Sequence, residues 1–202
     1  MRVIVTGASG ALGREVCSVL ATKGMQVVEI HGTDLSDPSQ ASKAIDGCAA
    51  GGPIDGLVNI AGGFAWETVA EGDVETWDRM WAMNLKTALN ASRAALAHMT
   101  DGGSIVNIGA AATAKATAGM GAYTASKSAV ARLTEALADE LRPRKIRVNA
   151  VLPTIIDTPS NREDMPDADF GAWVTTGQLA RIIAFLLSDE SSAVSGASIP
   201  TL

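Results

Sequence analysis

The chain has 202 residues and a formal net charge of −6, and 47% of its residues are apolar against 19% that are charged. This length suits one domain with a sizeable core, and the amino-acid composition excludes a disordered, collagen-like or low-complexity chain. Lysine and arginine are spread along the sequence instead of forming one basic block, which argues against nucleic acid or an anionic membrane as a partner.

Short apolar runs rich in β-branched residues alternate with longer alanine-rich segments of helical period. This alternation is typical of βαβ units, and it predicts an α/β fold with a doubly wound parallel sheet, three αβα layers and a single domain over residues 1–202. In chain order the predicted strands are Arg2–Val5, Gln26–Ile30, Leu57–Ile60, Ser104–Ile108, Ile146–Leu152 and Ala197–Pro200. The predicted helices are Ala11–Lys23, Pro38–Ala49, Val74–Met99, Tyr123–Leu141 and Thr176–Ser188.

Two segments depart from a regular alternation. The stretch from Ile30 to Ala49 is short for a full strand–helix–strand unit, so we expect one helix of the usual first half to be missing. Residues Asp157–Trp173 are rich in proline, aspartate and other polar residues, and they predict a lid-like excursion at about 157–175.

Metal and export signals are missing from the sequence. Cys17 and Cys48 stand outside any C-x-x-C or Cys/His cluster and are interpreted as buried thiols. The aspartates of the excursion lack the spacing of a calcium loop, and His98 is expected near the end of a long helix with a structural role, so no metal site is predicted. Only three consecutive apolar residues precede the first glycine turn and no run approaches a membrane span, which predicts a soluble, cytoplasmic protein with no membrane partner.

A glycine-rich turn follows the first predicted strand and opens a helix. Its glycines permit a tight turn and close approach of a pyrophosphate, and the helix N-terminus offers N–H donors to the phosphates, so we predict a dinucleotide site; an ordinary left-handed turn is the alternative. The candidate residues are Thr6, Gly7, Ser9, Gly10, Ala11, Leu12 and Gly13. The second strand ends in His31 and Gly32, where an acidic residue would favour NAD and an arginine NADP, so the cofactor is NAD or NADP; His31 on its own is more typical of a surface histidine.

A second motif places Tyr123 and Lys127 one helical turn apart on the same face. An ammonium group beside a phenol favours the phenolate, so we expect Lys127 to lower the pKa of Tyr123 toward the range useful for acid–base catalysis. Such a pair alone is typical of a solvated helix face, but the glycine turn upstream favours catalysis.

Over essentially its whole length, the sequence resembles the short-chain dehydrogenase/reductase family, which implies a Rossmann fold. The residues that carry this resemblance are Gly7, Gly10, Gly13, Asp34-Leu35, Asn59-Ile60-Ala61-Gly62, Asn84, Tyr123, Lys127, Pro153 and Thr158. The resemblance implies that Tyr123 is the acid–base group, that Lys127 binds the nicotinamide ribose and that Asn84 orders a water relay. It further implies cofactor contacts from Asp34 with Leu35 near the adenine, Asn59, Ala61 and Gly62 beside the adenosine ribose, and Pro153, Ile156 and Thr158 at the nicotinamide carboxamide.

Two departures from the family pattern indicate a subgroup. Ala110 stands where most members have a serine that helps to hold the substrate oxygen, with Thr113 or Ser104 as alternative sources of a hydroxyl, and the glycine spacing is G-x-x-G-x-x-G. Both departures, and the segment from Val151 to Trp173, are similar to the subgroup that dihydropteridine reductase represents.

The leading hypothesis is an NAD(P)-dependent oxidoreductase that transfers hydride between nicotinamide and a small planar C=N or C=O substrate, a dihydropterin being the first guess. The alternatives are a ketone or secondary-alcohol dehydrogenase and a dinucleotide-binding module without catalysis. Phe64, Ala110 and Trp173 are the candidate substrate contacts, although aromatic residues in loops more often serve as packing caps. The resemblance also implies a homodimer or homotetramer formed through the outer surfaces of Val74–Met99 and Tyr123–Leu141.

Overall fold

A computed structural model describes residues 1–201 and contains one six-stranded parallel sheet with the strand order β2-β1-β3-β4-β5-β8. The strands are β1 Arg2–Thr6, β2 Gln26–Ile30, β3 Ile54–Asn59, β4 Met99–Ile108, β5 Arg147–Leu152 and β8 Ser198–Pro200. The main helices are α1 Ala11–Thr22, α2 Pro38–Ala49, α3 Val74–Met80, the π-helix η1 Trp81–Lys86, α4 Thr87–Ala95, α5 Gly121–Glu140 and α7 Thr176–Leu187.

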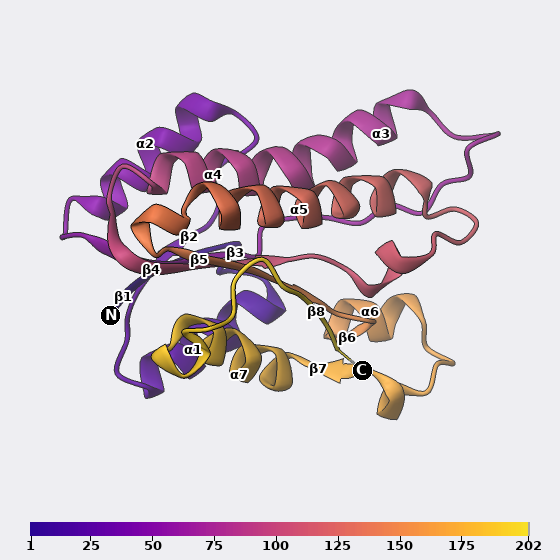
Figure 1. Cartoon of the computed structure of the whole chain (residues 1–202). Helices are drawn as coiled ribbons and strands as arrows, with labels where there is room; N and C mark the ends of the chain where they lie inside the picture. Colours follow the sequence, from indigo (N-terminus) through magenta and orange to yellow (C-terminus); the bar gives the residue numbers. More distant parts are fainter. Residues whose placement is uncertain (202) are drawn as a thin grey trace.

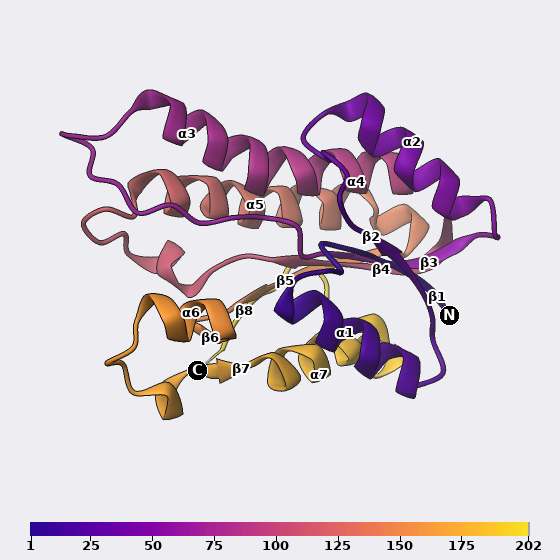
Figure 2. The ribbon, with the colours of Figure 1, turned by 180° about the vertical axis from the view of Figure 1, so that it is seen from behind.

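Helices cover both faces of the sheet. Figure 1 shows α2, α3, α4 and α5 above the strands and α1 with α7 below them, and Figure 2 shows the same layers from behind. Side chains of successive strand residues point to opposite faces, so Val3 and Val5 pack in the cluster of α1 and α7, whereas Ile4 packs with α2 and α5. The doubly wound, three-layer prediction is therefore confirmed.

Strand β1 pairs with β2 on one side and β3 on the other, so the chain changes direction across the sheet at this point. In such sheets ligands bind outside the carboxyl ends of the strands that flank the change of direction. Only residues 31–37 separate β2 from α2, and β2 forms the edge of the sheet. A single helix, α2, connects β2 to β3, and within the described residues no strand lies beyond β2 in this sheet.

The predicted helix Val74–Met99 is wrong in two respects. Its middle forms the π-helix η1, and helical structure ends at Ala95, because Met99 already belongs to β4 and lies opposite Ile54 of β3. His98 consequently lies outside the helix, and its Nε2 is 2.7 Å from Oδ1 of Asp46 on α2. It bridges two segments instead of capping a helix end.

The excursion at 157–175 is a packed substructure. It begins with β6 Ile156–Asp157, continues through α6 Pro159–Asp164 and the 3-10 turn η4 Phe170–Ala172, and returns in β7 Val174–Thr175, which pairs in parallel with β6. Arg162 holds both carboxylate oxygens of Asp157 and lies 4.7 Å from the centre of the Phe170 ring. The segment packs near the C-terminal ends of β5 and β8 (Figure 1).

The remaining structural expectations concern cysteines, metals and membranes. Cys17 is buried, which raises the pKa of its thiol to about 11, while Cys48 is only partly buried. Among residues 1–201 no cluster of three metal-ligating side chains occurs, and the same part of the chain has no helix of the length and apolarity needed to cross a membrane.

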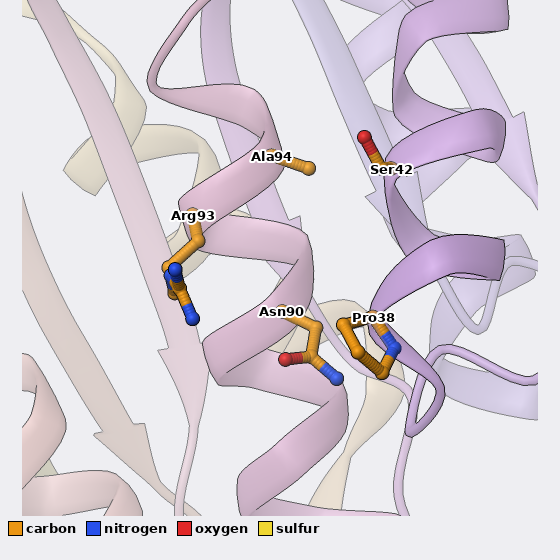
Figure 3. Close-up of a pocket in the computed structure, with 5 residues that line it drawn as sticks. All are labelled: Pro38, Ser42, Asn90, Arg93 and Ala94. Atoms are coloured by element: carbon orange, nitrogen blue, oxygen red, sulfur yellow. The ribbon is translucent and has the colours of Figure 1, made fainter.

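A surface cavity of about 250 Å³ lies between α2 and α4. Figure 3 shows its lining residues, which are Pro38, Ser42, Asn90, Arg93 and Ala94. The amide of Asn90 donates to the backbone oxygens of Leu35 and Ser36, so it fixes the loop after β2 against α4.

Candidate active site

The glycine turn at the end of β1 needs its glycines for two different reasons. Gly7 has φ +66°, and a Cβ there would lie 2.8 Å from the backbone nitrogen of Ala61. A Cβ on Gly13 would lie 2.2 Å from the carbonyl oxygen of Gly7, so α1 can approach the turn only if residue 13 has no side chain. The sequence therefore brings β1, α1 and the segment after β3 into direct contact.

The N-terminus of α1 matches the chemistry of a pyrophosphate. Gly10 is the N-cap residue of α1. No side chain there accepts a hydrogen bond from the N–H groups of the first helical turn. The first turn carries no acidic residue, and Ser9 and Gly10 are exposed. Backbone donors and the positive end of the helix dipole thus face solvent, and these residues fit the diphosphate of NAD(P).

Two predicted members of this site have structural contacts instead. Thr6 is buried, and its hydroxyl accepts from the backbone nitrogens of Ile60 and Ala61 at 3.1 and 3.3 Å. It fastens the segment after β3 to the end of β1. Leu12 is buried in the core beneath the turn, whereas Ala11 remains half-exposed beside it.

Residues assigned to the adenosine end behave differently from one another. His31 is exposed, and so is Asp34, whose carboxylate accepts from the backbone and hydroxyl of Ser36, which lowers the pKa of Asp34. Leu35 is buried in the core. Asn59 is also buried, and its amide donates to Ser92 on α4 and to Asn107 on β4, away from the turn. Of these four residues, only His31 and Asp34 have side chains that are open to a ligand.

The Tyr123 and Lys127 pair lies in the first turns of α5, as predicted. Lys127 is 6% exposed and its Nζ donates to the backbone oxygen of Ile108, at the end of β4, across 2.9 Å. The ring of Tyr123 meets that of Phe64 edge to face, with 5.0 Å between ring centres. Lys127 therefore lies at the carboxyl end of β4, and Tyr123 lies beside the segment that follows β3.

The expected lowering of the Tyr123 pKa by Lys127 is wrong for the protein alone. Burial of the phenol raises its pKa to about 12, while burial of the ammonium lowers the pKa of Lys127 to about 8. The ammonium is turned toward Ile108, so removal of both groups from water dominates over their mutual attraction. At neutral pH the phenol is therefore a neutral proton donor and Lys127 is mostly charged.

Asn84 lies in the π-helix η1 and is 1% exposed. Its Oδ1 accepts from the backbone nitrogen of Gly63 at 3.0 Å, and its Nδ2 donates to the oxygen of Gly63 and to Oγ of Ser126. A Cβ on Gly62 would lie 2.6 Å from this Oδ1 and 3.3 Å from Nζ of Lys127. The structure thus gathers the Asn84 and Lys127 side chains around one glycine.

The three candidate substrate residues occupy unlike positions. Phe64 is 58% exposed, so part of its ring is open to a ligand although the ring also contacts Tyr123. Trp173 is 9% exposed and packs against Phe170 within the excursion, as a packing cap would. Ala110 is 4% exposed in extended backbone directly after β4.

Neither alternative hydroxyl is free to replace the serine missing at Ala110. Thr113 donates its hydroxyl to the backbone oxygen of Ala110 itself, at 2.7 Å. Ser104 is fully buried and donates to the oxygen of Leu186 on α7, on the opposite face of the sheet. Neither side chain has a donor to spare for a substrate oxygen.

Residues assigned to the carboxamide end start the excursion. Thr158 is the N-cap of α6, and its Oγ1 accepts from the backbone nitrogen of Asn161. The backbone oxygen of Ile156 accepts from the amide of Asn161, while Pro153 is buried. This end is thus ordered by its own local hydrogen bonds.

Some contacts at the site could not be found from the sequence motifs. The indole of Trp66 lies over Gly119, at 2.1 Å from the place of a Cβ there, and the backbone nitrogen of Glu67 donates to the oxygen of Gly119. Ser126 joins Tyr123 to Asn84 by hydrogen bonds. Only a serine within the Tyr/Lys spacing and two glycines before Tyr123 mark these contacts, and neither pattern is specific.

The chain resembles known proteins over almost its full length. A family profile described as Enoyl-(Acyl carrier protein) reductase matches residues 1–201. The chain is 30% identical over 231 aligned positions to "Carbonyl reductase [NADPH] 2" of Sus scrofa, covering 98% of this chain and 93% of that protein. It is 37% identical to "Short-chain dehydrogenase/reductase ABA4" of Pyricularia oryzae, covering 81% of this chain and 67% of that protein.

Solved structures agree with this likeness. A short-chain dehydrogenase/reductase from Serratia marcescens superposes with a TM-score of 0.90 at 28% identity, covering 99% of this chain and 95% of that one. A blue fluorescent protein from a metagenomic library, solved in complex with NADPH, gives a TM-score of 0.90 at 29% identity and the same coverage.

Proposed function

The chain belongs to the short-chain dehydrogenase/reductase family and is an NAD(P)-dependent oxidoreductase, and on this premise we propose that it reduces a small planar C=N or C=O acceptor, a dihydropterin first. Membership among enzymes named as reductases and dehydrogenases leaves no support for a module without catalysis. When bound, NAD(P)H would supply the hydride, to the carbonyl carbon of a ketone or to the conjugated ring system of a quinonoid dihydropterin.

In this proposal Tyr123 gives its phenolic proton to the acceptor nitrogen or oxygen, and the C=N or C=O bond becomes a single bond. A phenol whose pKa is about 12 stays protonated at neutral pH, so it carries the proton that reduction requires. The phenolate that remains must regain a proton from solvent. Lys127, charged below a pKa of about 8, would hold the ribose hydroxyls and stabilise that phenolate.

The observation that carries the choice of acceptor is the shortage of hydroxyl donors beside Tyr123. Ala110 has none, and the hydroxyls of Thr113 and Ser104 are used on backbone oxygens. Loss of one donor from an oxyanion site costs about 2.7–4 kcal/mol in acyl-transfer enzymes. A quinonoid dihydropterin is a conjugated, electrophilic acceptor that needs less of this help than an isolated ketone.

Ketone reduction is the second candidate, favoured by the similarity to carbonyl and L-xylulose reductases. A side-by-side assay of NADH and NADPH oxidation with a dihydropterin and with a panel of ketones separates the two. A higher kcat/KM for the dihydropterin supports the proposal. Turnover of ketones alone would replace it with the second candidate.

A further inference from the structure

A buried serine lies between the two predicted catalytic residues of α5 and contacts neither of their reactive groups. Ser126 is 1% exposed, and its Oγ donates to the backbone oxygen of Tyr123 across 2.7 Å. Oγ of Ser126 also accepts a hydrogen bond from Nδ2 of Asn84 across 2.9 Å. One hydroxyl therefore joins the first turn of α5 to the π-helix η1.

Asn84 carries this link onward to the segment after β3. Its side-chain oxygen accepts from the backbone nitrogen of Gly63 at 3.0 Å, and its amide donates to the oxygen of Gly63 at 3.1 Å. An amide has two N–H groups, and those of Asn84 are fully used by Gly63 and Ser126. The orientation of the Asn84 side chain is therefore fixed from two sides.

The next residue along the chain connects this segment back to Tyr123. Phe64 follows Gly63, and its ring contacts the ring of Tyr123 with 5.0 Å between centres at an angle of 77°. The backbone of Tyr123 is thus held through Ser126 and Asn84, and its ring is held through Phe64, which follows Gly63.

The local helix geometry depends on the same contacts. A serine that donates to a carbonyl in the preceding turn bends a helix slightly, and a π-helix is a strained turn found mostly where function requires it. Ser126 of α5 and Asn84 of the π-helix η1 are joined directly by a side-chain hydrogen bond of 2.9 Å.

We propose that Ser126 is a positioning residue, which holds the turn of Tyr123 against Asn84 so that the phenol meets the acceptor at a fixed distance and angle. This inference rests on the proposed function of Tyr123. Small displacements are costly in such sites, since a misplacement of about 1 Å can lower a rate about 100-fold.

The test compares Ser126→Ala with Ser128→Ala, a half-buried serine of the same helix. We expect Ser126→Ala to lower kcat about tenfold or more, with the dissociation constant of NAD(P)H within about twofold of the parent. Ser128→Ala should leave both unchanged. A loss in Ser126→Ala of cofactor affinity as large as the loss in kcat would contradict a positioning role.

A spectroscopic readout tests the position of the phenol without turnover. Tyr123 is the only tyrosine in the chain, so ultraviolet absorbance of tyrosinate follows this one group during an alkaline titration. Burial raises the pKa of Tyr123 to about 12, and a looser turn in Ser126→Ala should admit water and lower that pKa. A titration and a kcat equal to those of the parent would overturn the inference.

Two further measurements keep the outcomes separate. If Ser126→Ala does not fold, Ser126→Cys gives the same comparison, because it keeps a side chain of similar size with a weaker donor. Tyr123→Phe is assayed in parallel. Activity equal to the parent in Tyr123→Phe refutes the proposed function, whereas loss of activity in Tyr123→Phe with full activity and an unchanged titration in Ser126→Ala refutes only the role of Ser126.

Discussion

The ammonium group of Lys127 donates to the backbone oxygen of Ile108 across 2.9 Å, at the end of the strand that leads to Ala110. Its burial lowers its pKa from 10.5 to about 8, so the folded protein binds this proton less tightly than the unfolded chain does. Between about pH 8 and 10.5 the unfolded chain holds more protons, so the contribution of this group to stability rises with pH. At neutral pH the buried charge is therefore a full cost to stability.

Lys127→Met should consequently abolish activity and stabilise the fold at neutral pH. The shift of the Lys127 pKa corresponds to about 3 kcal/mol of unfolding free energy, which the variant regains. The variant also loses the hydrogen bond to the oxygen of Ile108, which offsets about 1 kcal/mol of that gain. Urea unfolding at pH 7 and at pH 10 measures the difference between the variant and the parent, which should shrink at the higher pH. A variant less stable than the parent at pH 7 would be inconsistent with a costly buried charge.

Two substitutions in the glycine turn should have different effects, one on cofactor affinity and the other on stability. Gly10→Ala is expected to keep the melting temperature, because the nearest atom to its Cβ lies at 3.4 Å, and to weaken NAD(P)H binding about tenfold by crowding the phosphates. Gly13→Ala, with a contact of 2.2 Å, should cost about 1–3 kcal/mol of stability. Gly47→Ala, on α2 with open space around its Cβ, is the control. Parent-like cofactor affinity in Gly10→Ala would remove the turn from the binding site.

Restoring the missing hydroxyl should broaden the choice of acceptor. Ala110 has φ −156° and ψ 140°, a conformation that serine adopts freely, so Ala110→Ser restores a hydroxyl at this position without backbone strain. We expect kcat/KM for simple ketones to rise about tenfold or more, and that for a dihydropterin to change less. Ala112→Ser, in the following turn, serves as the control. An equal rise for both acceptor classes would argue against the role assigned to this position.

An apolar face on α3 and η1 suggests where copies of the chain associate. Val74, Trp77 and Trp81 are spaced for one helix face and are exposed by 73%, 40% and 44%. We expect a dimer or tetramer whose dissociation constant rises about tenfold or more in Val74→Glu/Trp81→Glu, measured by light scattering across a dilution series. Lys23→Glu, on the exposed end of α1, should have no effect. A parent protein that is monomeric at all concentrations would exclude this association.

Much of the fold followed from the sequence because its signals are local. The prediction of α2 as Pro38–Ala49 matches the structure at both ends, since Asp37 caps the helix and Pro38 occupies its first turn. The end of α4 was missed because Met99 continues an apolar helical spacing, and only its pairing with Ile54 makes it a strand residue. Long-range pairing of this kind leaves no local trace.

The site was predictable only as far as its residue types. The motifs located Tyr123, Lys127 and Asn84, but not the direction in which their side chains point. The pKa of Tyr123 was assigned the wrong direction because spacing along a helix gives the distance between two residues and not their burial. Ser126 was missed because a serine has many uses, and its role depends on Asn84, which lies 42 residues earlier in the sequence.

The central claim is that the phenol of Tyr123 supplies the proton for reduction. Tyr123→Phe keeps the ring that contacts Phe64 and removes only the hydroxyl, so folding and cofactor binding should persist. Steady-state oxidation of NAD(P)H with the preferred acceptor, together with the dissociation constant of NAD(P)H, measures the effect. We predict a fall in kcat of about 100-fold or more with the cofactor dissociation constant within about threefold of the parent. A kcat equal to that of the parent would contradict the account.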